Sequence, residues 1–172
     1  NNLYKRFYSK EKYQDLWFYW EGKPLIMALP DNLSPESERE KEILDFFTFR
    51  KNWAGYFDGD QSSEYWGWLS VYPQAKYLRP DGTVEQMTVG VAQNASEHGL
   101  VAMNDYRGGV YGRAYSSDID GKYSYTYTYR DSDITVDSDM ENAHYYGVNF
   151  QQQWDYALET DPTFIFVTGW NE

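Results

Sequence analysis

Two patterns of apolar residues alternate along the chain. One is a short continuous apolar run, and the other is a longer segment whose apolar residues recur at helical spacing. The last run, residues 163–168, consists almost entirely of β-branched and aromatic residues, and it lies between Asp161-Pro162 and Gly169. A run of this length and composition is typical of a buried strand, and the proline ends the helix that precedes it. The same criteria predict strands at residues 25–29, 44–49 and 85–94.

Amphipathic stripes predict helices at residues 9–20, 36–43 and 149–159. The stripe of the first helix comprises Tyr13, Leu16, Trp17 and Trp20, and that of the last comprises Phe150, Trp154, Ala157 and Leu158. These positions recur at the spacing of one helical face, so we expect them to be buried. Helices that alternate with strands over short connections indicate an α/β fold, in which parallel pairing is the default.

A long segment, residues 98–147, is rich in Tyr, Asp, Ser and Gly and shows no apolar helix pattern. Tyrosines alternate with Ser and Thr over residues 123–129, which predicts a hairpin strand or a stiff loop arm. Its aromatic content favours an ordered flap over a site. Because no repeat or low-complexity linker interrupts the chain, we expect residues 1–172 to form one domain that carries this segment as an insertion.

Composition narrows the classes of function. The formal charge of −12 argues against nucleic acid and anionic membrane surfaces as partners. Cysteine is absent, which excludes disulfides, a thiolate nucleophile and cysteine metal sites. Aromatic residues make up 20% of the chain, and many of them lie in polar, loop-like surroundings. Tryptophan and tyrosine rings match the apolar faces of sugar rings, so we expect a carbohydrate partner.

Candidate site residues cluster after the predicted strands. The final strand leads into Trp170 and Asn171, which are candidate substrate-binding residues, and then into Glu172. In parallel α/β sheets the carboxyl ends of strands are where ligands and catalytic groups gather, so Glu172 is the candidate catalytic carboxylate. The candidate sugar platforms are the aromatic residues Trp53, Trp66, Trp68 and Tyr72, and the candidate hydroxyl-binding amides are Gln74, Gln93 and Asn94. We expect neither a metal nor a cofactor.

The end of the chain resembles a known family. A Gln153-Trp154-x-x-Ala157-Leu158 helix, Asp161-Pro162 and a strand that ends in Gly169-Trp170-Asn171-Glu172 are similar to the late barrel region of endo-mannosidase-like glycoside hydrolases, family 99 and its relatives. The resemblance implies a (β/α)8 TIM barrel of which this chain is a part. It also implies that Glu172 corresponds to the first of two acting glutamates, in a retaining reaction assisted by the 2-hydroxyl of the sugar.

Other assignments stay open at this point. In further retaining barrel glycosidases an Asn-Glu pair ends the fourth strand and its glutamate is the general acid/base, which would place the chain in the first half of a barrel. We expect a glycoside hydrolase that acts on a neutral polysaccharide or glycan, outside the cytoplasm. The alternatives are a non-catalytic carbohydrate-binding protein or a barrel fused to a glycan-synthesis enzyme. A partial barrel would leave open sheet edges, so we also expect poor solubility or domain swapping.

Overall fold

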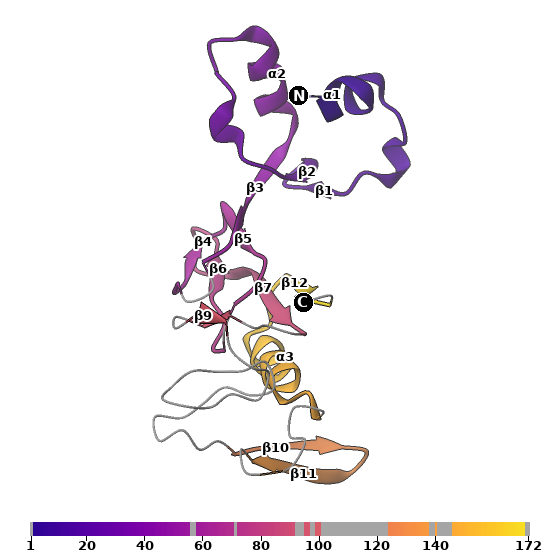
Figure 1. Ribbon diagram of the computed structural model, residues 1–172. Helices are drawn as coiled ribbons and strands as arrows, with labels where there is room; N and C mark the ends of the chain where they lie inside the picture. The colour runs from indigo at the N-terminus through magenta and orange to yellow at the C-terminus, as the bar shows by residue number, and fades with distance from the viewer. Residues whose placement is uncertain are drawn as a thin grey trace. The chain divides into compact units, whose positions relative to one another are not determined.

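The computed structural model describes residues 2–55, 58–70, 72–91, 124–137, 140 and 146–170, together with the backbone of residues 95–96 and 99–100 (Figure 1). The chain divides into a first unit, Asn1–Asn52 and Glu64–Trp66, and a second unit, Trp53–Ser63 and Gly67–Glu172. Gln93, Asn94, Asn171 and Glu172 lie outside the described residues.

The first unit contains a sheet with the strand order β1-β2-β3-β5. Its strands are β1 (Tyr19–Trp20), β2 (Lys23–Met27), β3 (Thr48–Trp53) and β5 (Tyr65–Gly67), the last residues of β3 and β5 belonging to the second unit. Its helices are α1 (Asn2–Arg6) and α2 (Glu38–Phe46), with 3-10 turns at Tyr8–Lys10, Gln14–Leu16 and Pro30–Asn32. β2 and β3 pair in parallel because α2 carries the chain back between them, whereas β1 and β2 pair antiparallel across a tight turn.

The core of the first unit is aromatic. Tyr4, Ile43 and Phe47 are buried and pack together, so α1 and α2 share one apolar cluster. The Tyr4 and Phe47 rings meet edge to face at 6.1 Å between centroids, an arrangement that aromatic pairs prefer. The Tyr4 hydroxyl donates a 2.7 Å hydrogen bond to Glu42, which satisfies its polar end.

The second unit contains a sheet with the order β12-β7-β6-β4. Its strands are β4 (Gln61–Ser62), β6 (Lys76–Leu78), β7 (Val84–Gly90) and β12 (Phe164–Thr168). β12 and β7 pair in parallel, in a register that sets Phe164 beside Gln86 and Thr168 beside Gly90. Helix α3 (Val148–Thr160) packs against β7, so this strand is covered on one face and paired at both edges.

Two further antiparallel pairs belong to the second unit. β8 (Ala95–Ser96) pairs with β9 (Gly99–Leu100), and β10 (Ser124–Tyr129) pairs with β11 (Ser132–Asp137). The β10–β11 turn places both Arg130 and Asp131 at positive φ, as a two-residue type I′ hairpin turn requires. Of the two interpretations of the alternating tyrosines, the hairpin is therefore confirmed.

The predicted (β/α)8 TIM barrel is wrong. The described residues form a small α/β structure with three α-helices and sheets of mixed pairing. A barrel of that class needs parallel strands that each lead into a helix. Here β6 turns back into β7 without a helix, because residues 79–83 form a tight turn in which the Gly82 N–H donates to the Arg79 carbonyl at 2.9 Å. The β6–β7 pair is consequently antiparallel.

The predicted helix at residues 9–20 is also wrong. α1 ends at Arg6, and Glu11 and Tyr13 both have positive φ, which an α-helix does not tolerate. Of its expected stripe, Tyr13 and Leu16 are exposed. The predicted strand at residues 44–49 begins later, at Thr48, because α2 continues to Phe46 and places its last turn in the aromatic core.

Candidate functional site

β7 and β12 end side by side at one edge of their sheet. The Val91 N–H donates a 2.9 Å hydrogen bond to the Thr168 carbonyl, so the pairing of the two strands extends to their last residues. The carboxyl ends of parallel strands lie together on the same side of a sheet. In α/β proteins, ligands bind at these carboxyl ends. The chain continues from these ends into Gln93-Asn94 and Asn171-Glu172, which lie outside the described residues.

A buried network of amide side chains holds the carboxyl end of β7. Gln153 on α3 is fully buried, accepts a 2.6 Å hydrogen bond from the Gly90 N–H, and donates a 2.8 Å bond to the Ser70 carbonyl. Asn149, one turn earlier on α3, donates to the Gly90 carbonyl at 3.1 Å. Both polar groups of the Gly90 backbone are therefore held by α3 side chains, which fixes the end of β7.

Two tryptophans stand at this edge with exposed rings. The Thr168 hydroxyl donates to the Trp68 carbonyl, which ties the backbone of Trp68 to the end of β12. Trp170 follows Thr168 by two residues, and its ring contacts Phe150 on α3 at 6.2 Å between centroids. The exposed fractions are 43% for Trp68 and 70% for Trp170. Large indole faces are thus available to a ligand beside a rigid strand end.

The other predicted platforms differ in exposure. Trp66 is 1% exposed and lies in the first unit, where the Arg50 guanidinium stands 6.0 Å from its ring, so its face is closed to a ligand. Trp53 is partly buried, and its indole N–H donates a 3.1 Å hydrogen bond to Asp58. The Trp53 carbonyl accepts a hydrogen bond from the Trp68 N–H at 3.2 Å, so these two residues are neighbours.

Tyr72 and Gln74 lie on the segment that leads into β6. The Tyr72 ring packs edge to face on Tyr156 of α3 at 5.8 Å, and Lys76 lies 5.3 Å from the same Tyr156 ring. The hydrogen bond with Tyr156 raises the pKa of Lys76. Gln74 is 1% exposed and donates to the Gln153 carbonyl at 2.7 Å, so its amide stabilises the fold rather than facing a ligand.

Sequence reasoning missed the residues that hold this edge. The buried positions of α3 include Asn149, Gln152 and Gln153, whereas Leu158, expected in the buried stripe, is 66% exposed. The signal was present as an amide cluster, Asn149 and Gln151-Gln152-Gln153, at the start of a helix otherwise short of charge. Amides this close together on a helix that packs on a sheet end are suited to bond exposed strand termini.

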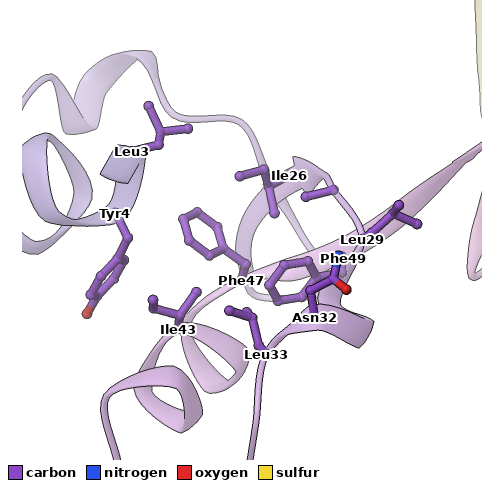
Figure 2. Close-up of a pocket in the computed structure, with 10 residues that line it drawn as sticks. Leu3, Tyr4, Ile26, Leu29, Asn32, Leu33, Ile43, Phe47 and Phe49 are labelled. Carbon is purple, nitrogen blue, oxygen red and sulfur yellow. The ribbon is translucent and has the colours of Figure 1, made fainter. Parts of the chain in front are cut away.

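The first unit holds a pocket of different chemistry. It has a volume of about 120 Å³ and largely apolar walls, with Asn32 as a polar lining residue, whereas the Tyr4 hydroxyl points away from the pocket and bonds Glu42 (Figure 2). The lining residues are Leu3, Tyr4, Ile26, Ala28, Leu29, Asn32, Leu33, Ile43, Phe47 and Phe49. Sugars need several hydrogen-bonding groups, so this pocket does not suit them.

Across the described ranges, no group of three or more His, Asp or Glu side chains has a geometry that could hold a metal ion. None of the helices within these ranges combines the length and apolarity needed to span a membrane.

Comparisons of the chain with protein-family models, curated proteins and solved structures find no match.

Proposed function

We propose that the chain binds a neutral glycan at the carboxyl ends of β7 and β12 and hydrolyses a glycosidic bond there. The observation that carries the proposal is the pair of exposed indoles, Trp68 and Trp170, at the end of one strand. An indole face can stack on the apolar face of a pyranose ring while the ring edges stay open to polar contacts.

Several features favour a neutral glycan over other ligands. Exposed apolar patches, rather than single exposed residues, mark ligand-binding surfaces, and Trp68 and Trp170 both lie at the end of β12. The formal charge of −12 disfavours anionic ligands such as nucleic acid or acidic polysaccharides. Because the Thr168 and Gln153 hydrogen bonds fix the strand ends, the platform loses little conformational entropy when it binds.

Hydrolysis is assigned to Glu172, which follows Thr168 by four residues. Cleavage of a glycosidic bond needs one carboxyl group to protonate the leaving oxygen and a second group to stabilise or attack the anomeric carbon. The role of Glu172 rests on its position after β12 and on the resemblance of this stretch to retaining glycosidases. A polymeric substrate would be met outside the cytoplasm, so we place the protein there.

The test combines glycan binding with product release on a panel of neutral glycans. We expect Trp170→Ala and Trp68→Ala each to weaken binding at least tenfold, or about 1.4 kcal/mol. Tyr13→Ala, which removes an exposed ring in the first unit, serves as the matched control and should change neither quantity. Glu172→Gln should retain binding and lose about 10² to 10⁴ in rate, the range for a residue in general acid–base catalysis.

The outcomes separate enzyme from binding protein. Binding that depends on both tryptophans without any product release would establish the non-catalytic alternative and remove the role of Glu172. Equal binding by the wild type and the two tryptophan variants would disprove the proposed platform.

A further inference from the structure

The pocket of the first unit lies on one face of the β2–β3 pair. Ile26 and Phe49 are register partners in this pair, and both line the pocket. Ala28 and Phe47 also line it, each two residues from one of these partners, so the four positions share a face. The Ala28 N–H donates a 3.1 Å hydrogen bond to the Arg50 carbonyl, which continues the pairing of β2 as far as Ala28. The floor of the pocket is therefore a paired sheet surface.

The walls come from α1 and from the connection between β2 and β3. Side chains from α1, from α2 and from the segment before α2 surround the floor: Leu3, Tyr4, Ile43, Leu29 and Leu33 (Figure 2). Tyr4 and Ile43 are buried, whereas Leu3 and Leu29 are 47% and 57% exposed. The lining thus combines a buried part with side chains that solvent, and so a ligand, can reach.

The polar atoms at the pocket do not require a polar ligand. The Tyr4 hydroxyl points away and donates its hydrogen bond to Glu42 at 2.7 Å. Asn32 is exposed, so water can bond its amide. The other lining residues are Ala, Ile, Leu and Phe, and none of the lining side chains is charged. An uncharged apolar ligand would therefore bury no unpaired polar group, whereas a charged one would lose its water without gaining an ion partner.

The volume of the pocket limits the size of the ligand. It is about 120 Å³. An apolar cavity of about 150 Å³ lined by Leu, Ile and Phe stays free of water and holds benzene. A space of this size and chemistry fits one small ring, and it is too small for a fatty acyl chain.

The aromatic side chains of the floor favour a flat ring over other apolar groups. The Phe47 and Phe49 rings meet edge to face, with 5.8 Å between their centroids. Aromatic rings attract one another in this arrangement beyond the effect of buried area. A third ring in the pocket can extend the same arrangement.

We propose that the first unit binds a small uncharged molecule with a single aromatic ring in this pocket. The inference is independent of the proposed glycan function, because every lining residue belongs to the first unit and the two exposed tryptophans of the glycan site belong to the second. The two sites also differ in chemistry, since one is an enclosed apolar pocket and the other an exposed platform.

Titration of the full chain with benzene, followed by methyl NMR, tests the proposal. The methyl signals of Ile26, Leu33 and Ile43 should shift and reach saturation, because a bound ring lies against them. The methyls of Val89, which is fully buried in the second unit, should not shift. Pocket methyls that do not respond would overturn the proposal. Equal shifts at Val89 would also overturn it, because they would show unspecific partition of benzene into apolar cores.

A variant that fills the pocket tests where the ring binds. Ala28→Leu adds carbon atoms at the floor and should weaken benzene binding by about tenfold or more, because a close-packed interior leaves no space for both. Ala54→Leu makes the same change at an exposed residue outside the pocket and should leave the affinity unaltered. Circular dichroism checks that both variants are folded, and the titration of the wild type does not depend on them. Unchanged affinity in Ala28→Leu would overturn the proposal.

Discussion

At the residue scale, the Gln153 side chain has a larger structural role than its position on a helix suggests. It bonds the Gly90 N–H and the Ser70 carbonyl, and both hydrogen bonds are buried inside the second unit. A buried donor or acceptor without a partner costs about 1–3 kcal/mol. Through its two hydrogen bonds, the Gln153 amide links α3 to the end of β7 and to the segment that contains Ser70.

We expect Gln153→Leu, which preserves side-chain volume, to lower the free energy of unfolding by about 2–5 kcal/mol, because two buried backbone groups lose their partners. Urea denaturation monitored by circular dichroism measures this loss. Gln151→Leu makes the same chemical change two residues earlier, where the amide bonds only the exposed Asp155, and should cost less than about 1 kcal/mol. Equal losses for the two variants would contradict the role given to Gln153.

At the element scale, one arginine joins the start of β7 to the segments beside it. Arg79, after β6, forms a 3.2 Å ion pair with the fully buried Glu85 of β7 and donates a 2.9 Å hydrogen bond to Thr163 just before β12. Three strands of the sheet are thus tied at their ends opposite the proposed site. Breaking a buried ion pair leaves the remaining charge in a poorly solvated place.

Arg79→Met retains the apolar stem but removes the charge, and we expect it to lower the free energy of unfolding by about 3–5 kcal/mol. Chemical denaturation checks the value. Lys51→Met removes the cation from the surface pair with Asp31 and should have a much smaller effect, since water screens that pair. If the Arg79 variant proved as stable as the wild type, the pair with Glu85 would not hold these strand ends.

The sequence contains signals for some of these elements but not for others. The turn between β6 and β7 is predicted by Pro80-Asp81-Gly82, a strong turn sequence, and the structure confirms the turn; the same sequence argues against a helix at that point. The strand core of β12 and the extent of α3 followed from apolar runs and a proline boundary. The interrupted helix near Tyr13 could not be predicted from periodicity, because the spacing of apolar residues carries no signal for the positive φ that Glu11 and Tyr13 adopt.

At the scale of the whole molecule, two tyrosines make stability depend on alkaline pH. Burial raises the pKa of Tyr77 to about 12, and a hydrogen bond with Glu42 raises that of Tyr4 to about 12. The unfolded chain releases these protons near pH 10. Because the folded chain holds them more tightly, this contribution to stability is complete below about pH 10 and is lost as pH rises toward 12.

We expect Tyr77→Phe to flatten the fall in unfolding free energy between about pH 10 and 12 by about 2–3 kcal/mol, the equivalent of its pKa shift. Unfolding curves at several alkaline pH values measure the slope. Tyr13→Phe, at an exposed ring, should leave the slope unchanged. A slope that stays the same in Tyr77→Phe would show that other groups control alkaline unfolding.

The sequence by itself determined the features that depend on neighbouring residues. Apolar runs, turn residues and prolines determined where β7, β12, α3 and the β10–β11 hairpin form, and the alternation of elements predicted their α/β class. The tertiary structure decided how the strands pair, and it placed Trp68 and Trp170 at one strand end while burying Trp66. It also selected Gln153 over Leu158 for the buried face of α3. These outcomes depend on contacts between distant segments, whose hydrogen-bonding demands override the local apolar pattern.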